Sequence, residues 1–195
     1  MVRKLNPEKK AQFMRTALSL FVAQGVQNTS TAEIARGAGT AAGTLFIYFP
    51  TKQDLIHALI LQIGRQQSEY IKSLLVQPMP ARETFQAIWH GSITWFLENM
   101  EAYQYVQQVR DSGIIAAEVV MESQKYFEYY YQAIQKGLEE QSIRPYPLEL
   151  IGGMLYQDIV AIMNLISRQP DRLRQEQYIH AGFDVFWNGI KAAVD

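Results

Sequence analysis

The segment Thr29–Lys52, TSTAEIARGAGTAAGTLFIYFPTK, constrains the fold of this chain more than any other part of the sequence. Ser30 and Glu33 have the spacing of a capping box, in which each side chain binds the backbone amide of the other residue. The helix that starts there is predicted to end near Arg36-Gly37. A second short helix is predicted over about 40–48, before Phe49-Pro50 ends it. Two short helices joined by a glycine-containing turn are the pattern of a helix-turn-helix.

The apolar residues of this segment predict which sides of the two helices are buried. Ile34 and Ala35 are expected to pack the first short helix onto its neighbour, and Leu45 and Phe49 to anchor the second. The residues left facing outward are Thr40, Ala41, Ala42, Gly43, Thr44 and Tyr48. A helix in the DNA major groove presents its N-terminal residues to the bases, and small side chains with methyl groups can meet thymine methyls.

The ends of the segment are candidates for contacts with phosphate. Ser30 and Thr31 lie at a predicted helix N-terminus, where free amides and the helix dipole favour an anion. Lys52 opens the next helix and adds positive charge at the other flank. Residues 1–52 carry seven basic against two acidic residues, a net charge of +5, whereas the rest carries eleven against seventeen, a net charge of −6. This asymmetry indicates that only the N-terminal part meets a polyanion, although chance variation in surface charge gives the same numbers.

The rest of the chain also predicts helices, so the fold class is all-α. Asn6 is a helix cap followed by Pro7, and Thr51 caps a long helix that starts near Lys52 and runs towards Leu75. Pro78 and Pro80 interrupt the pattern. Later helices are predicted at about 81–100, 102–112, 114–141, 147–168 and 172–193.

The stretch Gly25–Leu55 resembles the DNA-binding domain of the tetracycline-repressor (TetR/AcrR) family. The matching residues are Ile34-Ala35, Gly39, Gly43-Thr44-Leu45, Tyr48-Phe49, Lys52 and Leu55. The resemblance implies an N-terminal DNA-binding domain over 1–51, with its motif at about 30–49, and a helical ligand-binding and dimerisation domain over 52–195. It also implies contacts with DNA at Thr31, Thr40, Ala41, Ala42, Gly43, Thr44, Phe46, Tyr48 and Lys52.

Three residues depart from the family pattern. Ala42 stands where many members have Lys, Phe46 where Tyr is usual, and Ile47 where His is common. Each change removes a polar group. The sequence therefore predicts either weaker electrostatic contact with DNA or greater reliance on apolar readout and on the basic N-terminal arm.

The C-terminal part is rich in tyrosine and tryptophan, and buried tyrosine hydroxyls need hydrogen-bond partners. A ligand cavity satisfies this need because such sites combine apolar walls with a few polar groups. Trp89, Ile93, Phe96 and Met100 lie on one helical face and are expected to form one wall. The candidates for the other walls are Tyr103, Gln107, Val120, Phe127, Tyr130 and Asp158. For any one of these residues, an ordinary place in the protein core is the alternative.

The last two predicted helices carry more apolar residues than one helix face hides, and a four-helix bundle made by two copies would bury the surplus. Small residues that allow close approach are Gly152, Gly153, Ala161 and Gly182. The apolar set is Ile151, Leu155, Ile159, Ile162, Ile166, Ile179, Phe183, Phe186, Trp187 and Ile190. For each member, dimer interface and monomer core are equal alternatives.

Several classes of function find no support in the sequence. There is no cysteine, the three histidines show no metal-ligand spacing, and no motif of a hydrolase or nucleotide-binding enzyme is present. The N-terminus lacks the apolar run of a signal peptide, and Gln157, Asp158 and Asn164 interrupt the most apolar stretch. We therefore predict a cytoplasmic homodimer that uses no cofactor or metal, does not insert into a membrane, and is not an enzyme.

The combined prediction is a repressor that binds an operator in double-stranded DNA and is released by a small, largely apolar effector. Two alternatives stay open at this point. One is a DNA-binding protein that lacks a ligand or acts as an activator. The other is a protein of the same fold with weak or no DNA binding, which acts as a small-molecule binder or an enzyme.

Overall fold

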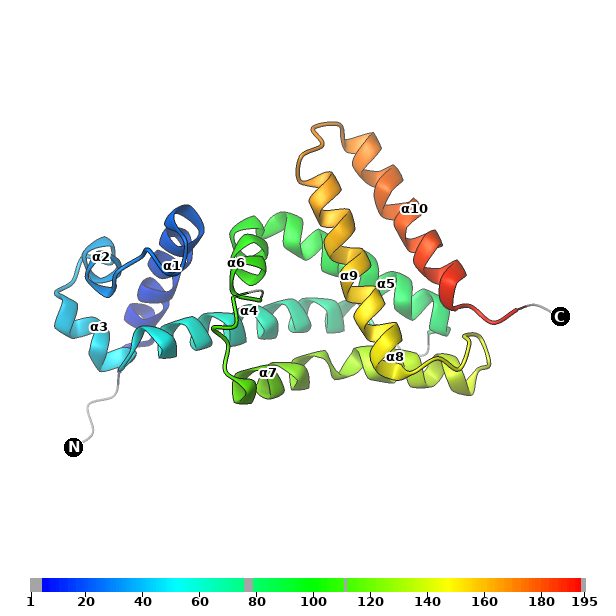
Figure 1. Cartoon of the computed structure of the whole chain (residues 1–195), viewed down its shortest axis with the longest axis horizontal. Coiled ribbons are helices and arrows are strands. Elements are labelled where there is room, and N and C mark those ends of the chain that lie inside the picture. Colours follow the sequence, from blue (N-terminus) through cyan, green and yellow to red (C-terminus); the bar gives the residue numbers. More distant parts are fainter. Residues whose placement is uncertain (1–4, 76–78, 111, 194–195) are drawn as a thin grey trace. The chain divides into compact units, whose positions relative to one another are not determined.

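The structure is a computed structural model that describes residues 5–75, 79–110 and 112–193 (Figure 1). These residues form helices and no named strand, which agrees with the all-α prediction; a single bridge joins Ile143 to Lys191. The helices are α1 (Pro7–Gln24), α2 (Thr31–Gly37), α3 (Ala42–Tyr48), α4 (Lys52–Leu74), α5 (Ala81–Glu98), α6 (Met100–Arg110), α7 (Ala117–Gln124), a 3-10 turn η1 (Lys125–Phe127), α8 (Glu128–Glu139), α9 (Leu148–Ile166) and α10 (Arg172–Ile190).

The caps predicted from the sequence start the first helices. Asn6 Oδ1 accepts hydrogen bonds from the amides of Glu8 and Lys9 at the start of α1. At the start of α4, the amide of Thr51 donates to Asp54 Oδ2 at 2.9 Å, and the amide of Asp54 donates to Thr51 Oγ1 at 3.1 Å. Such pairs satisfy amides that have no partner inside the helix, so they fix where each helix begins.

One prediction about the helices is wrong: the expected helix over 114–141 is divided. Helix α7 starts only at Ala117, and η1 separates it from α8. The hydroxyl of Ser68 on α4 donates to the carbonyl of Tyr126, so this carbonyl has a partner outside its own helix. No residue of α7 is buried, so packing gives this short helix little support.

The chain packs as two compact units. Unit 1 contains the described residues of Met1–Gly64 and Asn99–Ser123, and unit 2 contains those of Arg65–Glu98 and Gln124–Asp195. Helix α4 contributes its first part to unit 1 and its last part to unit 2. These are units of packing, whereas the expected boundary at residues 51 and 52 separates functions and stays a prediction.

The core of unit 1 joins the N-terminal helices to α6. Phe21 on α1 and Tyr105 on α6 stack with their ring centroids 5.9 Å apart, and both are fully buried. The hydroxyl of Tyr105 donates to the carbonyl of Ile56 on α4 at 2.9 Å. This hydrogen bond satisfies the buried polar group, so α1, α4 and α6 hold one another in place.

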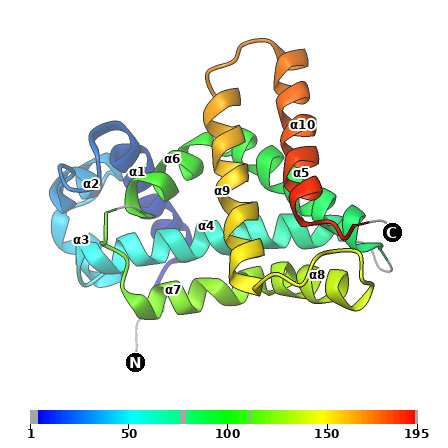
Figure 2. The same ribbon diagram turned by 45° about the vertical axis from the view of Figure 1, so that its right-hand side comes forward.

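Unit 2 is built around Trp89 on α5 and the antiparallel pair α9 and α10, which run side by side in both views (Figures 1 and 2). The indole of Trp89 donates to the carbonyl of Ile179 on α10 at 2.9 Å. A Cβ atom at Gly182 would lie 2.6 Å from Ile162 Cδ1 and 2.9 Å from Trp89 Cζ2. The absence of a side chain at Gly182 therefore allows α5, α9 and α10 to approach closely.

The structure decides between core and surface for the apolar residues of α9 and α10. Nine of the ten candidates are buried within this chain, and Ile179 is half-buried; the nine are Ile151, Leu155, Ile159, Ile162, Ile166, Phe183, Phe186, Trp187 and Ile190. Other residues face outward: Leu150, Met154, Ala161 and Leu165 on α9, and Tyr178, Ala181 and Val185 on α10. Among the described helices, only α9 is long and apolar enough to cross a membrane, and a core helix meets the same criterion.

Candidate functional site

Helix α2 is held in place by buried residues at and before its start. Ile34 and Ala35 are buried, as predicted. The hydroxyl of Thr29, which is also buried, donates to the carbonyl of Gly25 at 2.9 Å. The capping box is complete: the Ser30 amide donates to Glu33 Oε2 at 2.8 Å, and the Glu33 amide donates to Ser30 Oγ at 3.2 Å.

This capping box affects the predicted phosphate contact at Ser30. The hydroxyl of Ser30 donates to Glu33 Oε2 at 2.7 Å, so its proton is already in use. Hydrogen bonds from the backbone and side chain of Ser30 lower the pKa of Glu33, which keeps its carboxylate charged. A phosphate at Ser30 would thus lie beside the negative charge of the Glu33 carboxylate, to which Ser30 is hydrogen-bonded. Thr31 in the first turn of α2 is the other candidate for this contact.

The turn between the two short helices depends on Gly39 and Thr40. Gly39 has φ +63°, a left-handed conformation that favours glycine. Thr40 then returns to the end of α2, because its amide and its hydroxyl both donate to the carbonyl of Ala35, at 2.9 and 3.2 Å. Helix α3 therefore starts at Ala42 instead of about residue 40, and the hydroxyl of Thr40 supports the turn.

Helix α3 presents a small and apolar surface. Its anchors Leu45 and Phe49 are buried, as predicted. The exposed residues are Ala41, Ala42, Gly43, Phe46 and Ile47, while Thr44 is half-buried. A Cβ atom at Gly43 would meet no atom within 4 Å. The outer face of α3 is therefore free to approach another surface closely.

Tyr48 does not face away from the core, so that prediction is wrong. It is half-buried, and its ring packs against Phe13 on α1 with the centroids 5.5 Å apart. Its hydroxyl accepts a hydrogen bond from the amide of Asn6 at 3.3 Å. The ring lies over the start of α1 because the C-terminal turn of α3 packs there.

The basic residues near α3 are partly engaged inside unit 1. Lys52 Nζ donates to the carbonyl of Gln27 at 3.4 Å, and partial burial lowers the pKa of Lys52. Lys10 Nζ lies 5.6 Å from the centroid of the Phe49 ring. Arg36 is exposed on α2. The basic residues of this region therefore lie on α1, α2 and α4, and α3 itself carries none.

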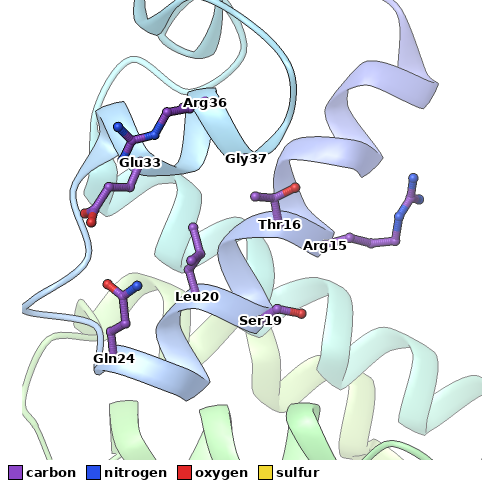
Figure 3. Close-up of a pocket in the computed structure, with 8 residues that line it drawn as sticks. All are labelled: Arg15, Thr16, Ser19, Leu20, Gln24, Glu33, Arg36 and Gly37. Atoms are coloured by element: carbon purple, nitrogen blue, oxygen red, sulfur yellow. The ribbon is translucent and has the colours of Figure 1, made fainter.

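An open groove lies between α1 and α2 (Figure 3). Its volume is about 570 Å³, and its lining is Arg15, Thr16, Ser19, Leu20, Gln24, Glu33, Arg36 and Gly37. A Cβ atom at Gly37 would lie 2.8 Å from Thr16 Cγ2, so the two helices are in close contact at that point. This groove was not predicted from the sequence.

The predicted site left out Ile47, which the sequence analysis noted only as a departure from the family pattern; it is 63% exposed and the most exposed large apolar residue of α3. It follows Gly43 by one helical turn, so helical spacing places the two residues on one face. This spacing was the signal available in the sequence. Ile47 therefore joins Ala41, Ala42, Gly43 and Phe46 as a candidate for contact with DNA.

The predicted ligand residues divide between the two units. Trp89, Ile93 and Phe96 are buried on α5, and unit 2 also contains Phe127, Tyr130 and Asp158. Burial raises the pKa of the half-buried Asp158. Unit 1 contains Met100, Tyr103 and Gln107 on α6 and the exposed Val120 on α7. The structure thus brings six of the ten residues into one unit.

Two polar residues near this set were missed. Ser92 on α5 is buried, and its hydroxyl lies 3.3 Å from that of Tyr130. Tyr129 is buried beside Tyr130, with the ring centroids 4.8 Å apart. The helical spacing of Tyr129, Ala133 and Gly137, all buried, was the available signal for Tyr129.

Comparison with known proteins adds independent information. The sequence profile described as "Bacterial regulatory proteins, tetR family" matches residues 13–59. The transcriptional regulator LuxR of Vibrio harveyi is 32% identical over 91 residues, which are 46% of this chain and 44% of LuxR. The regulator SrpR of Pseudomonas putida is 23% identical over 92% of this chain and 84% of its own length. The alignment with LuxR thus spans less than half of that protein.

A solved structure extends the likeness to almost the whole chain. It is a protein from Shewanella sp. PV-4, described as a TetR-family transcription regulator. The two structures agree with a TM-score of 0.88 at 28% identity, over 95% of this chain and 99% of that one. Together with the buried anchors of α2 and α3, these similarities indicate a DNA-binding transcription regulator of the TetR family: the family profile matches residues 13–59, and almost the whole chain shares the fold of the Shewanella protein.

Proposed function

We propose that the protein is a homodimeric repressor that binds a two-fold operator and leaves it when a small, largely apolar effector binds to the C-terminal body. The observation that carries the DNA-binding part is the outer face of α3. Its side chains are exposed and small or apolar, while Leu45 and Phe49 anchor it from below. This combination suits a rigid helix that enters the major groove.

The contacts with DNA are proposed from the position of each residue. The methyl groups of Ala41, Ala42 and Thr44 and the side chain of Ile47 suit thymine methyls, and Gly43 permits close approach. Phosphate contacts are assigned to Lys52 and to the N-terminus of α2. The complete proposed set is Ser30, Thr31, Thr40, Ala41, Ala42, Gly43, Thr44, Phe46, Ile47, Tyr48 and Lys52.

Dimerisation is proposed through the outward faces of α9 and α10. Leu150, Met154 and Leu165 are exposed along one side of α9, and Val185 is 74% exposed on α10. Exposed apolar residues at helical spacing on two adjacent helices suit a four-helix bundle with a second copy. An operator with two half-sites would match the two-fold symmetry of this dimer.

The effector is proposed to bind the C-terminal body at Trp89, Ile93, Phe96, Met100, Tyr103, Gln107, Val120, Phe127, Tyr130 and Asp158. Helix α4 follows α3 in the chain and continues into unit 2, so it would transmit the change. An effector acts only if it binds one conformation more tightly than the other, and such coupling is typically about 1–3 kcal/mol. We also assign the protein to the cytoplasm and assign it no enzymatic reaction.

A second candidate function has one observation in its favour. The exposed face of α3 carries no charged side chain, so contacts with phosphate from this helix are few. The alternative is a TetR-fold protein that binds or converts a small molecule and has weak or no affinity for DNA. Failure to bind DNA, together with binding or turnover of a compound, would favour it.

The decisive experiment is a fluorescence-anisotropy titration of labelled DNA from upstream of the protein's own gene, against scrambled DNA of the same length and base composition. Salt is kept the same near physiological strength because phosphate contacts alone give affinity that is independent of sequence. We expect tighter binding to the upstream DNA. If the operator lies elsewhere in the genome, it can be found by selecting the fragments of a genomic library that bind to the protein. Absence of sequence-selective binding in both assays would contradict the proposal.

A further inference from the structure

Tyr129 on α8 has a buried hydroxyl that lacks a partner. The residue is 4% exposed, and its Oη atom makes no hydrogen bond of normal geometry with a described residue, although burial and, to a lesser degree, its interaction with the neighbouring Tyr130 hydroxyl raise its pKa. Tyr131, two residues later, is 43% exposed and has access to water. Buried polar groups in proteins nearly always have a hydrogen-bond partner, so an exception of this kind indicates a binding role or a specific strain.

The side chains around Tyr129 define a small polar cluster in apolar surroundings. Phe127 contacts Tyr129 edge-on at a centroid distance of 6.2 Å, and the ring of Tyr130 lies at 4.8 Å. The hydroxyls of Tyr130 and Ser92 lie 3.3 Å apart and share one hydrogen bond. We call Ser92, Tyr129 and Tyr130 the hydroxyl cluster; the hydroxyl of Tyr129 takes no part in the bond between the other two.

The cluster adjoins the apolar residues of α5. Ile88 and Phe96, one turn before and one turn after Ser92, are both buried. Helical spacing puts these three residues on one face of α5. A molecule at the hydroxyl cluster would therefore meet hydrocarbon and aromatic groups over most of its surface, with hydrogen-bonding groups at one point.

Burial around the hydroxyl cluster favours a neutral partner, although the ammonium group of Lys72 lies 5.9 Å from the centroid of the Tyr129 ring. Burial is the main cause that raises the pKa of both tyrosines, for Tyr130 to about 12, so both hydroxyls stay protonated at physiological pH. Burial also raises the pKa of Asp158 in the same unit. These shifts share one cause, since a negative charge is poorly solvated there. An uncharged acceptor avoids that penalty.

We propose that Tyr129 Oη donates a hydrogen bond to the carbonyl oxygen of a neutral, largely apolar effector, such as a ketone or an ester. The proposal rests on the proposed function, because it specifies the chemistry of the effector that the C-terminal body takes. The carbonyl oxygen would accept a hydrogen bond from the hydroxyl of Tyr129. The apolar remainder of the effector would pack against the residues of α5.

The test compares ketones with alkenes of the same shape. Acetophenone, benzophenone and 2-decanone are each paired with the compound in which C=CH₂ replaces C=O, and benzoate serves as a charged probe. Ligand-observed NMR titrations measure each dissociation constant with the full-length protein. We expect wild type to bind at least one ketone about 5- to 10-fold more tightly than its alkene, which is the range of one net hydrogen bond. Benzoate should bind more weakly than acetophenone.

Tyr129→Phe removes only the hydroxyl, and the exposed Tyr131→Phe is the matched control. In Tyr129→Phe, the affinity for the ketone should fall to that of its alkene, while the affinity for the alkene stays unchanged. Tyr131→Phe should keep the preference of wild type. Equal binding of ketone and alkene by wild type, or no binding of any ketone in the series, would overturn the proposal.

A measurement without ligand gives a second criterion. Tyr129→Phe loses no hydrogen bond of normal geometry to a described residue, so its melting temperature should equal or exceed that of wild type. Tyr105→Phe, which loses the bond to Ile56, should melt at a lower temperature. If Tyr129→Phe melts as low as Tyr105→Phe, its hydroxyl has a partner, such as a bound water, and the proposal is wrong.

The outcome for DNA binding separates this inference from the proposed function. Sequence-selective DNA binding without any preference for ketones overturns only the inference about Tyr129. A preference for ketones that depends on Tyr129, in a protein that binds no DNA selectively, overturns the repressor function. In that case the hydroxyl cluster remains a carbonyl site of a small-molecule binder.

Discussion

The hydroxyl of Tyr48, at the end of α3, accepts a hydrogen bond from the backbone amide of Asn6, the cap of α1, at 3.3 Å. This bond and the contact with Phe13 tie α3 to α1 and its cap. Tyr48 therefore positions α3 in addition to any contact that it makes with DNA.

Replacing Tyr48 with Phe tests this positioning role. The variant keeps the ring on Phe13 and loses one partly exposed hydrogen bond, so the free energy of unfolding should fall by about 1 kcal/mol or less. Tyr48→Ala also loses the ring contact and should lose more, about 3 kcal/mol or above. Chemical denaturation measures both values. Equal losses in the two variants would show that the ring contact with Phe13 contributes nothing.

Restoring a cation on α3 should strengthen DNA binding. Ala42→Lys places a charge on an exposed position of α3 without touching the buried anchors. Each new phosphate contact should steepen the plot of log affinity against log salt by about 0.9 per protomer. Anisotropy titrations at several salt concentrations measure the slope. The control is Gln132→Lys on the exposed side of α8, which adds the same single positive charge away from α3 and should leave the slope nearly unchanged. If both variants steepen the slope equally, the cause is net charge and not a contact made by α3.

Gly182→Ala should destabilise unit 2. The new methyl group would lie 2.6 Å from Ile162 Cδ1, and overpacking typically costs about 1–3 kcal/mol, against a gain in helix propensity of about 1 kcal/mol. Ile162→Val removes the Cδ1 atom, so the double variant should recover part of the loss. Thermal unfolding measures each variant. The control Gly189→Ala has open space around its Cβ atom and should be neutral or stabilising; a similar loss there would contradict the packing explanation.

The proposed dimer face can be tested by a substitution that leaves the core unchanged. Val185→Glu places a charge on a residue that is 74% exposed in the single chain, so helicity should persist while the dimer dissociates. Light scattering after size-exclusion chromatography measures the molar mass, which should fall from that of a dimer to that of a monomer. The affinity for a two-fold operator should decrease as well. The control is Gln132→Glu, which adds a negative charge at an exposed position of α8 and should leave the dimer intact. A Val185→Glu variant that stays fully dimeric would place the interface elsewhere.

His90 should make stability depend on pH. Burial, and to a lesser degree the neighbouring His180, lower the pKa of His90 in the folded chain below its ordinary value, while the bond to the Gln86 carbonyl opposes the shift. As the pH falls below about 6.5, the unfolded chain therefore binds a proton that the folded chain does not, and stability decreases until the folded-state pKa is passed.

The measurement is the melting temperature at pH 7.5 and 5.5. It should decrease more for wild type than for His90→Gln, and His180→Gln should show an intermediate decrease. Asp184 on α10 and Arg82 on α5, 3.7 Å apart, are further charges on these two helices, and both variants leave them in place. Equal decreases in wild type and His90→Gln would show that other groups cause the pH dependence.

Local signals predicted much of the fold correctly. The caps Asn6, Ser30 and Thr51 act on amides within three residues, so their effect is visible in the sequence. Leu45 and Phe49 were predicted as anchors because helical spacing separates buried from exposed positions. These features required no knowledge of distant parts of the chain.

The errors concern contacts between residues far apart in the sequence. The break at Lys125–Phe127 accompanies a hydrogen bond from Ser68, and Tyr48 is covered by Phe13; neither partner is adjacent in the sequence. The sequence showed that α9 has more apolar residues than one helix face can bury. Only the packing of α9 against α5 and α10 decides which of them stay exposed to solvent. The unpaired hydroxyl of Tyr129 is likewise a property of its three-dimensional surroundings.

The open space around Gly43 has a consequence for how this regulator changes over evolutionary time. A side chain added there meets no atom within 4 Å, and the neighbouring Ala41 and Ala42 are also exposed. If α3 reads the bases as proposed, mutations at these positions would alter the preferred DNA sequence while leaving the buried anchors intact. Operator preference would then diverge after gene duplication through single substitutions, because folding sets few conditions on residues 41–43.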